Sequence, residues 1–239
     1  MYGFFPMGAV YGIDIYYIIL VLPAVLVALV AQMMVKNTFS RYQSIGSIKG
    51  LTGYEVVRNM LDSNNLHSIS IERVAGNLND HYDPKKKVIR LSDSVYDSPS
   101  VAAIGVAAHE AGHALQYADG YFPIRIRSMM VPVTNIGSTL SMPLILIGLF
   151  SGVSPFIYIG IGLFSLVTVF QLITLPVEYN ASNRALSTLK GLGILNENEL
   201  KSSKKVLSAA ALTYVASLLV SFMSLLRILL LTRERSRRR

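Results

Sequence analysis

The sequence predicts a mainly α-helical membrane protein with about four transmembrane helices and a small α/β part between them. Hydrophobic residues make up 52% of the 239 residues and charged residues only 15%, whereas soluble domains carry about 25% charged residues. Several apolar runs are long enough to cross a hydrocarbon core of roughly 30 Å as helices. One stretch near the middle of the chain instead mixes short strand-like and helix-like segments.

The composition restricts the kinds of partner and of metal site. The formal net charge is +8, which in a membrane protein is typical of cytoplasm-facing loops and of contact with anionic lipid headgroups. We expect a lipid bilayer around the chain and no nucleic-acid partner, because no nucleic-acid-reading module is recognisable. The sequence indicates no oligomeric state. Without cysteine, a metal site must use His, Asp and Glu side chains.

The first apolar run covers residues 15–34 and carries no charged residue. Pro23 lies inside this run, which transmembrane helices tolerate. A signal peptide would have a basic start, and no Lys or Arg precedes the run. Residues 1–35 are therefore expected to be an N-terminal segment with a retained membrane helix.

A hydrophilic part follows over residues 36–128, and its first half predicts one helix and two strands. The helix covers residues 51–65, with Thr52 and Glu55 spaced as in a capping box. Two short stretches have strand-like patterns, residues 67–74 and 86–92. The second strand could bind a peptide along its edge.

The second half of this part predicts one long helix. Ser98 is the expected N-cap, and Pro99 takes the first helical position. Gly120 is the expected stop residue. The interior of this helix contains the stretch "VAAHEAGHALQ", residues 106–116.

Two further apolar runs, residues 129–150 and 155–175, contain no charge and are separated by the short "SGVS". They predict a transmembrane hairpin over residues 129–176. Pro176 either starts a new helix or kinks the existing one. Residues 177–205 then form a helix and a polar segment.

The last segment, residues 206–239, is an apolar helix with a basic tail. The distribution of Lys and Arg places the hydrophilic part in the cytoplasm, but the five arginines after Thr232 would lie on the opposite side if this helix crosses. Its polar positions form one stripe, which suits helix packing in membranes and favours crossing: Ser217, Ser221, Ser224 and Arg227.

The residues 109–113 have the pattern H-E-x-x-H. On an α-helix, His109 and His113 share one face and can offer two ring nitrogens to a single zinc ion. Glu110 is displaced around the helix, where it can act as general base toward a water molecule activated by the metal. Gly112 costs helix stability, up to roughly 1 kcal/mol relative to alanine, so we expect close packing there.

Such a short pattern also arises by chance in helices that bind no metal. The clear start and stop signals of this helix favour the zinc interpretation. A buried cluster of histidine and glutamate without a metal would also need other polar partners.

Catalytic zinc usually has three protein ligands, and Glu178 is the best candidate for the third. The hairpin returns the chain to the membrane face at which the histidine helix ends, and Glu178 follows directly. The alternative interpretation of Glu178 is a helix-start carboxylate stabilised by the helix dipole. His81 is the competing ligand candidate, with hydrogen bonding or oxyanion stabilisation as its other roles. Its acidic neighbours are expected to be turn residues: Asp80 and Asp83.

Five longer blocks carry a resemblance that covers nearly the whole chain: "GLTGYEVVRNML", "DHYDPKKKVIRLS", "AAHEAGHALQYADGY", "LPVEYNASNRAL" and "KKVLSAAALTYVASLL". With these blocks the chain resembles the YugP-type neutral zinc metallopeptidases of bacterial membranes. More distantly it is similar to the HtpX and CAAX-prenyl-protease group of gluzincins. The resemblance implies a zincin-like catalytic part with one zinc ion per chain. It also implies the site roles: His109, His113 and Glu178 as zinc ligands and Glu110 as the base.

One position departs from the pattern of these proteins. Glutamate-zincins commonly carry an aspartate four residues after the ligand glutamate, and here that position is Ser182. A hydroxyl can still accept a hydrogen bond from an imidazole N–H, as a weaker partner, and Asn180 and Asn183 are alternatives. Arg184 could stabilise the oxyanion of the reaction or contact lipid headgroups.

The sequence as a whole predicts a multi-pass metalloprotease of the cell membrane with its site facing the cytoplasm. Its substrate would be a peptide or a membrane protein. A zinc-binding membrane scaffold without turnover is the alternative. A transporter would need ionisable residues inside its spans, and the first three apolar runs have none.

Overall fold

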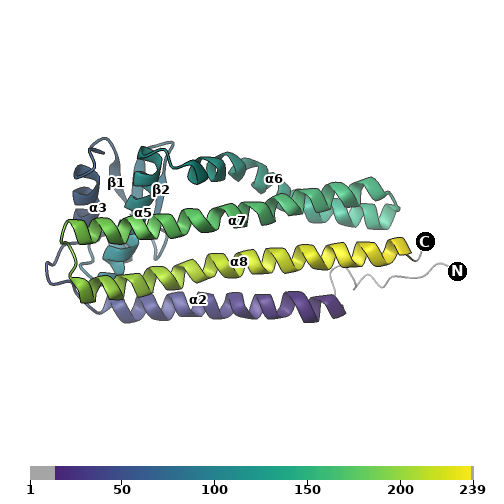
Figure 1. Ribbon diagram of the computed structural model, residues 1–239, viewed down its shortest axis with the longest axis horizontal. Coiled ribbons are helices and arrows are strands. Elements are labelled where there is room, and N and C mark those ends of the chain that lie inside the picture. The colour runs from purple at the N-terminus through teal and green to yellow at the C-terminus, as the bar shows by residue number, and fades with distance from the viewer. Residues whose placement is uncertain (1–13, 238–239) are drawn as a thin grey trace. The chain divides into compact units, whose positions relative to one another are not determined.

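The computed structural model describes residues 14–237, and most of this part is helical. The helices are η1 (Tyr17–Val21), α2 (Leu22–Gln43), α3 (Gly53–Asp62), α4 (Asp93–Tyr96), α5 (Val101–Ala118), α6 (Phe122–Ser151), α7 (Ser154–Gly191) and α8 (Glu197–Arg237). Three short strands form one small sheet, and Figure 1 shows them with the helices: β1 (Ser70–Val74), β2 (His81–Asp83) and β3 (Val88–Ser92).

Among the described residues, four helices are long and apolar enough to cross a membrane, as the sequence predicts: Tyr17–Gln43, Phe122–Ser151, Ser154–Gly191 and Glu197–Glu234. Helix α7 continues through Pro176, so of the two alternatives for this proline the start of a new helix is excluded. Proline removes only one backbone donor from a long helix. Glu178 therefore lies on the same helix as the preceding apolar run.

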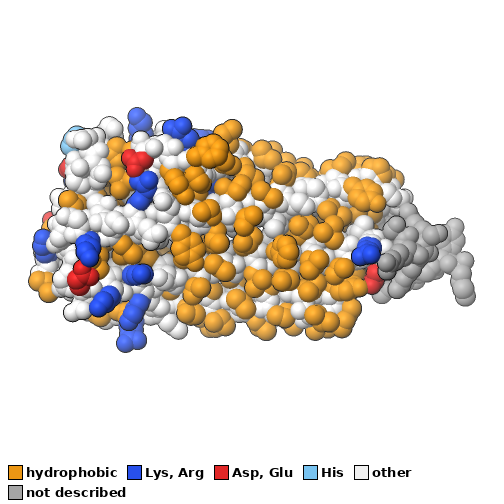
Figure 2. All heavy atoms as spheres, in the orientation of Figure 1, with side chains coloured by type: hydrophobic (Ala, Val, Ile, Leu, Met, Phe, Trp, Pro, Cys, Tyr) orange, Lys and Arg blue, Asp and Glu red, His pale blue; other side chains and the backbone are white. Residues whose placement is uncertain are grey.

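The chain divides into two compact units, and each is described by itself. Of the described residues, the helical unit contains residues 14–30, Ile126–Thr174 and residues 214–237. The sheet unit consists of Ala31–Arg125 and Leu175–Thr213. On the face shown in Figure 2, hydrophobic side chains cover the long helices of the helical unit, and most charged side chains gather over the sheet unit.

Within the helical unit, polar side chains connect helices that are distant in sequence. The hydroxyls of Thr168 on α7 and Ser221 on α8 are 2.8 Å apart. Ser221 belongs to the predicted polar stripe, and this contact is the kind of helix packing that such a stripe favours. Near the chain ends, Nε of Arg227 donates to Oδ2 of Asp14 at 2.8 Å.

The sheet of the sheet unit has the strand order β1-β3-β2. Strand β3 pairs in parallel with β1 and antiparallel with β2. Because β3 has a neighbour on each side, the predicted edge binding of a peptide at residues 86–92 is wrong. The two edge strands are β1 and β2, and β2 lies in a stretch that the sequence predicted as a turn.

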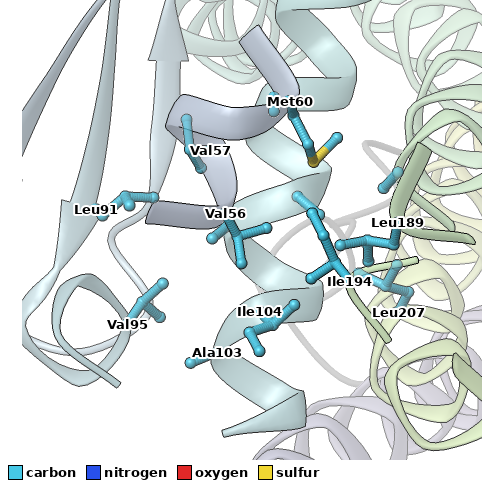
Figure 3. Close-up of a cluster of buried hydrophobic side chains, with 14 of the residues drawn as sticks. Val56, Val57, Met60, Leu91, Val95, Ala103, Ile104, Leu189, Ile194 and Leu207 are labelled. Carbon is cyan, nitrogen blue, oxygen red and sulfur yellow. The ribbon is translucent and has the colours of Figure 1, made fainter. Parts of the chain in front are cut away.

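Helix α5 packs against α3 and the sheet, and its buried face forms the centre of the hydrophobic core (Figure 3). The capping box of Thr52 and Glu55 begins α3 as predicted. At the start of α5 the N-cap is Ser100, whose hydroxyl accepts from the backbone N–H of Ala103. The prediction of Ser98 as N-cap is wrong by two residues, because Ser98 and Pro99 lie in a segment that bonds to residues 47–53. At the other end, Gly120 has a φ of +66° and stops the helix as predicted.

Candidate metal centre

Helix α5 carries the H-E-x-x-H pattern, and most residues of this helix are buried. Residues 101–105 and 107–108 are buried, and small side chains let neighbouring elements approach closely. His113 is buried, and His109 is partly exposed. The rings of His109 and His113 meet edge to face, with centroids 4.7 Å apart.

At Gly112 the backbone of α5 lies close to the backbone of α7. A Cβ atom at this position would lie 2.5 Å from the backbone oxygen of Ala181. This close approach explains why a glycine, which weakens a helix, occupies the middle of the motif. It also positions the stretch of α7 that includes Glu178.

Substitution Gly112→Ala is expected to force α5 and α7 apart and to lower the free energy of unfolding by about 1–3 kcal/mol. It should also weaken zinc binding, because Glu178 lies one turn before Ala181. Thermal unfolding and zinc titration measure both effects. Gly191→Ala is the matched control, since nothing lies within 4 Å of its added Cβ. Equal behaviour of the two variants would contradict this explanation of Gly112.

The carboxylate of Glu178 comes to the same point as both histidines. Its Oε2 atom lies 3.1 Å from Nε2 of His109 and 3.6 Å from Nε2 of His113. One ligand atom from each residue lies within 4.8 Å of the others. Glu178 is 2% exposed, so the predicted third candidate is brought together with the histidine pair inside the sheet unit.

The second ring nitrogen of each histidine has its own partner. Nδ1 of His109 lies 3.0 Å from the hydroxyl of Ser182. Ser182 occupies the position at which glutamate-zincins commonly carry an aspartate. Nδ1 of His113 lies 2.9 Å from Oε1 of Gln116. These contacts hold both rings so that their Nε2 atoms face Glu178.

Gln116 is a functional residue that the sequence reasoning missed. Its side chain is fully buried, and its Nε2 donates to the backbone oxygen of Val177 at 2.8 Å and to Oδ1 of Asn180 at 2.9 Å. Oε1 of Gln116 is then the atom that faces His113, so Nδ1 of His113 is the donor. In a neutral ring this leaves a lone pair on Nε2. The signal was available, because Gln116 follows His113 by three residues on one helix.

These residues fit a zinc ion. Two imidazole nitrogens and one carboxylate oxygen are usual catalytic zinc ligands, with bonds of about 2.0–2.2 Å. Tetrahedral geometry separates such ligand atoms by roughly 3.3 Å, close to the 3.1 Å and 3.6 Å found between the carboxylate and the two rings. Partners that fix the Nδ1 atoms are typical of metal-binding histidines.

The charges around His113 favour a cation at this point. Burial lowers the pKa of His113, but the interaction with Glu178 and the negative charge of Glu110 outweigh burial and raise that pKa above its usual value. The same negative charges would favour a metal ion, which competes with the proton for the ring nitrogen.

Glu110 is buried on α5, and a second carboxylate lies near it. Asp80, just before β2, accepts hydrogen bonds from the backbone N–H of Ser92 at 2.8 Å and from its hydroxyl. Burial raises the pKa of Asp80, and the charge of Glu110 adds to this rise. Asp80 is therefore more than a turn residue, whereas Asp83 has the predicted turn role and accepts from the N–H groups of Lys85 and Lys86.

His81 is exposed on β2, and its described hydrogen bonds do not reach the zinc-ligand candidates. Nδ1 of His81 lies 2.9 Å from the backbone oxygen of Asn79, and Nε2 lies 3.3 Å from Nη1 of Arg90. Successive residues of a strand face opposite sides, and the neighbouring Tyr82 faces Tyr117 of α5. The structure thus directs His81 away from α5, and its role in oxyanion stabilisation stays a prediction.

Arg184 is connected to the polar residues behind the histidines. Its Nε donates to Oδ1 of Asn180 at 2.8 Å, its Nη1 pairs with Asp119, and its guanidinium lies 5.9 Å from the ring centroid of Tyr121. Asn180 thereby links Arg184 to Gln116. The roles of Arg184 toward an oxyanion or toward lipid headgroups stay predictions.

Comparison with known proteins gives a consistent result. The family model described as "Putative neutral zinc metallopeptidase" matches residues 17–233. A relative from Bacillus subtilis (strain 168), described as "Putative membrane protease YugP", is 45% identical over 215 residues, which cover 90% of this chain and 96% of the relative. No solved structure matches the chain.

Proposed function

This chain belongs to the family of neutral zinc metallopeptidases whose model it matches, and we propose that it hydrolyses peptide bonds as an integral membrane enzyme. The observation that carries the proposal is the convergence of His109, His113 and Glu178 on one point, with the buried Glu110 directly after His109 on α5. A zinc-binding scaffold would need the three ligands but would not need a buried carboxylate next to them.

In the proposed mechanism, His109, His113 and Glu178 would hold one zinc ion, which when bound would supply Lewis-acid chemistry toward the scissile carbonyl and the attacking water. Glu110 accepts the proton of the attacking water and returns it to the leaving amine nitrogen. Ser182 and Gln116 keep the two imidazole rings in the orientation that this arrangement needs.

The substrate peptide is proposed to lie along β2. This strand is at the edge of the sheet, and its outer side carries no other strand in the described part of the chain. Free backbone groups of an edge strand can pair with an extended peptide. Tyr82 of β2 also packs on α5, so a peptide at this edge would pass close to the metal-binding helix.

The enzyme is proposed to cross the cell membrane several times with this site on the cytoplasmic side. Four apolar helices of sufficient length support the membrane location. The positions of Lys and Arg around the spans support the orientation. A site held near the bilayer favours membrane proteins, or peptides released from membranes, as substrates.

Metal removal tests the proposed function. The purified full chain is expected to hold one zinc ion, to lose peptide hydrolysis completely on chelation and to regain it when zinc is added back, because the ion supplies the electrophile. Metal analysis and cleavage of a labelled peptide library measure both properties. Hydrolysis that persists in the zinc-free protein would contradict the proposal, and zinc binding without any hydrolysis would favour the scaffold.

A further inference from the structure

Two tyrosines pack against each other next to the metal centre, and the proposed mechanism does not use them. Tyr82 lies on β2 and Tyr117 on α5, with ring centroids 5.7 Å apart and ring planes at 64°. Both side chains are partly buried. Tyr117 follows His113 by four residues, which places it about 6 Å further along the same side of the helix.

The two rings lie at one end of a contact between β2 and α5. Glu110 and Tyr117 are seven residues apart and therefore share one face of α5. The contact between Tyr82 and Tyr117 therefore lies along the face of α5 that carries the general base.

The opposite side of β2 has a different chemical character. His81 is exposed there, and its cross-strand neighbour Arg90 pairs with Glu72 and Asp83. A peptide along the edge of β2 would present alternate side chains to these two sides. The side with Tyr82 and Tyr117 offers apolar ring surface. Aromatic rings bind large apolar side chains, and they bind other aromatic rings preferentially in stacked or edge-to-face arrangements.

We propose that Tyr82 and Tyr117 form a subsite for one large apolar or aromatic side chain of the substrate peptide, close to the scissile bond. This inference rests on the proposed function, because it names the substrate class of that same site. It predicts that the enzyme prefers segments with residues such as Phe, Tyr or Leu at one fixed position.

The test measures peptide binding to the zinc-loaded full chain that carries Glu110→Gln, so that no cleavage interferes. The probes are fluorescein-labelled peptides of Ala and Ser in which a single Phe is moved through every position. One register is expected to bind about tenfold more tightly than the peptide without Phe, which is typical of an apolar pocket. Tyr82→Ala and Tyr117→Ala should each remove most of this preference, whereas Tyr82→Phe should keep it.

A second ring pair provides the matched control. Tyr54 and Tyr96 have centroids 5.1 Å apart on α3 and α4, so Tyr96→Ala removes a similar contact and should leave the preference unchanged. If Tyr82→Ala does not accumulate, Tyr82→Leu keeps much of the volume and should reduce the preference for Phe. Equal binding of all registers, or a preference that survives both alanine variants, would overturn the subsite.

The outcomes for the subsite and for the proposed function are distinguishable. Register-dependent binding that requires Tyr82 and Tyr117 supports the subsite even if the wild-type chain cleaves no peptide, in which case only the proposed hydrolysis fails. Hydrolysis by the wild-type chain without any preference for a large apolar residue overturns the subsite and leaves the hydrolysis intact. Absence of both binding and hydrolysis contradicts both.

Discussion

Glu110→Gln is expected to lower the rate of peptide hydrolysis by about 10²–10⁴-fold, the usual contribution of a general acid–base group, while zinc remains bound. The glutamine amide has nearly the shape of the carboxylate but cannot accept the proton of the attacking water. The proposed zinc ligands are His109, His113 and Glu178, whose ligand atoms meet at one point. None of these three residues is changed in this variant. Activity should therefore disappear without loss of metal.

Zinc content and the turnover of a labelled peptide should be measured on the same purified samples. Glu55→Gln is the matched control, since Glu55 belongs to the capping box of α3, in which glutamine serves as well as glutamate. A Glu110→Gln protein that cleaves as fast as the wild type would refute the assigned base. If this protein retains substrates without cleaving them, proteomic analysis of what it holds would identify the natural ones.

Glu178→Ala is expected to lower zinc affinity more than 100-fold. Loss of a residue that only hydrogen-bonds to a metal ligand lowers affinity by roughly 10–100-fold, and loss of a ligand itself should cost more. The substitution removes the only carboxylate of the three-residue cluster found among the described residues. Two histidines alone leave the ion with too few protein ligands for a catalytic site. Hydrolysis should fall with the metal content and recover only in part at high zinc concentration.

Two graded controls test this assignment. Ser182→Ala and Gln116→Ala remove only the Nδ1 partners of the histidines and should weaken zinc binding by about 10–100-fold. Tyr179→Phe changes the half-exposed neighbour of Glu178 and should leave zinc binding unchanged. Stoichiometric zinc at unchanged affinity in Glu178→Ala would show that the third ligand is another residue.

Several parts of the candidate site could be predicted because their signals are local or compositional. The helix around His109 and His113 was predicted from capping signals at its start and from the stop at Gly120. The third ligand candidate followed from the hairpin and from the scarcity of acidic residues around Glu178. The hydrogen-bonding role of Ser182 was implied by the resemblance to glutamate-zincins, which commonly carry an aspartate at this position. The first helical turn was less well predicted, because Ser98 and Ser100 carry equivalent capping groups and only the packing of the preceding segment selects Ser100.

Other parts could not be predicted because they depend on which segments meet in space. The pattern of residues 79–85 is that of a turn, and only pairing with β3 makes residues 81–83 an edge strand. The same pairing decides that Tyr82 faces α5 and that His81 faces away from it. Asp80 near Glu110 is a consequence of that pairing as well.

The sequence by itself determined which helices are long and apolar enough to cross a membrane, the H-E-x-x-H pattern of α5 and the residues that could complete a metal site. These properties depend on helix periodicity, on span length and on ligand chemistry, which act over a few residues. Only the tertiary structure decided that Glu178, which is 69 positions away from His109, meets both rings. It also decided that Gln116 orients His113 and that β2 lies along α5. For Glu178 the physical reason is the close approach of α5 to α7 at Gly112, and the distance between two helices depends on the packing of the elements around them.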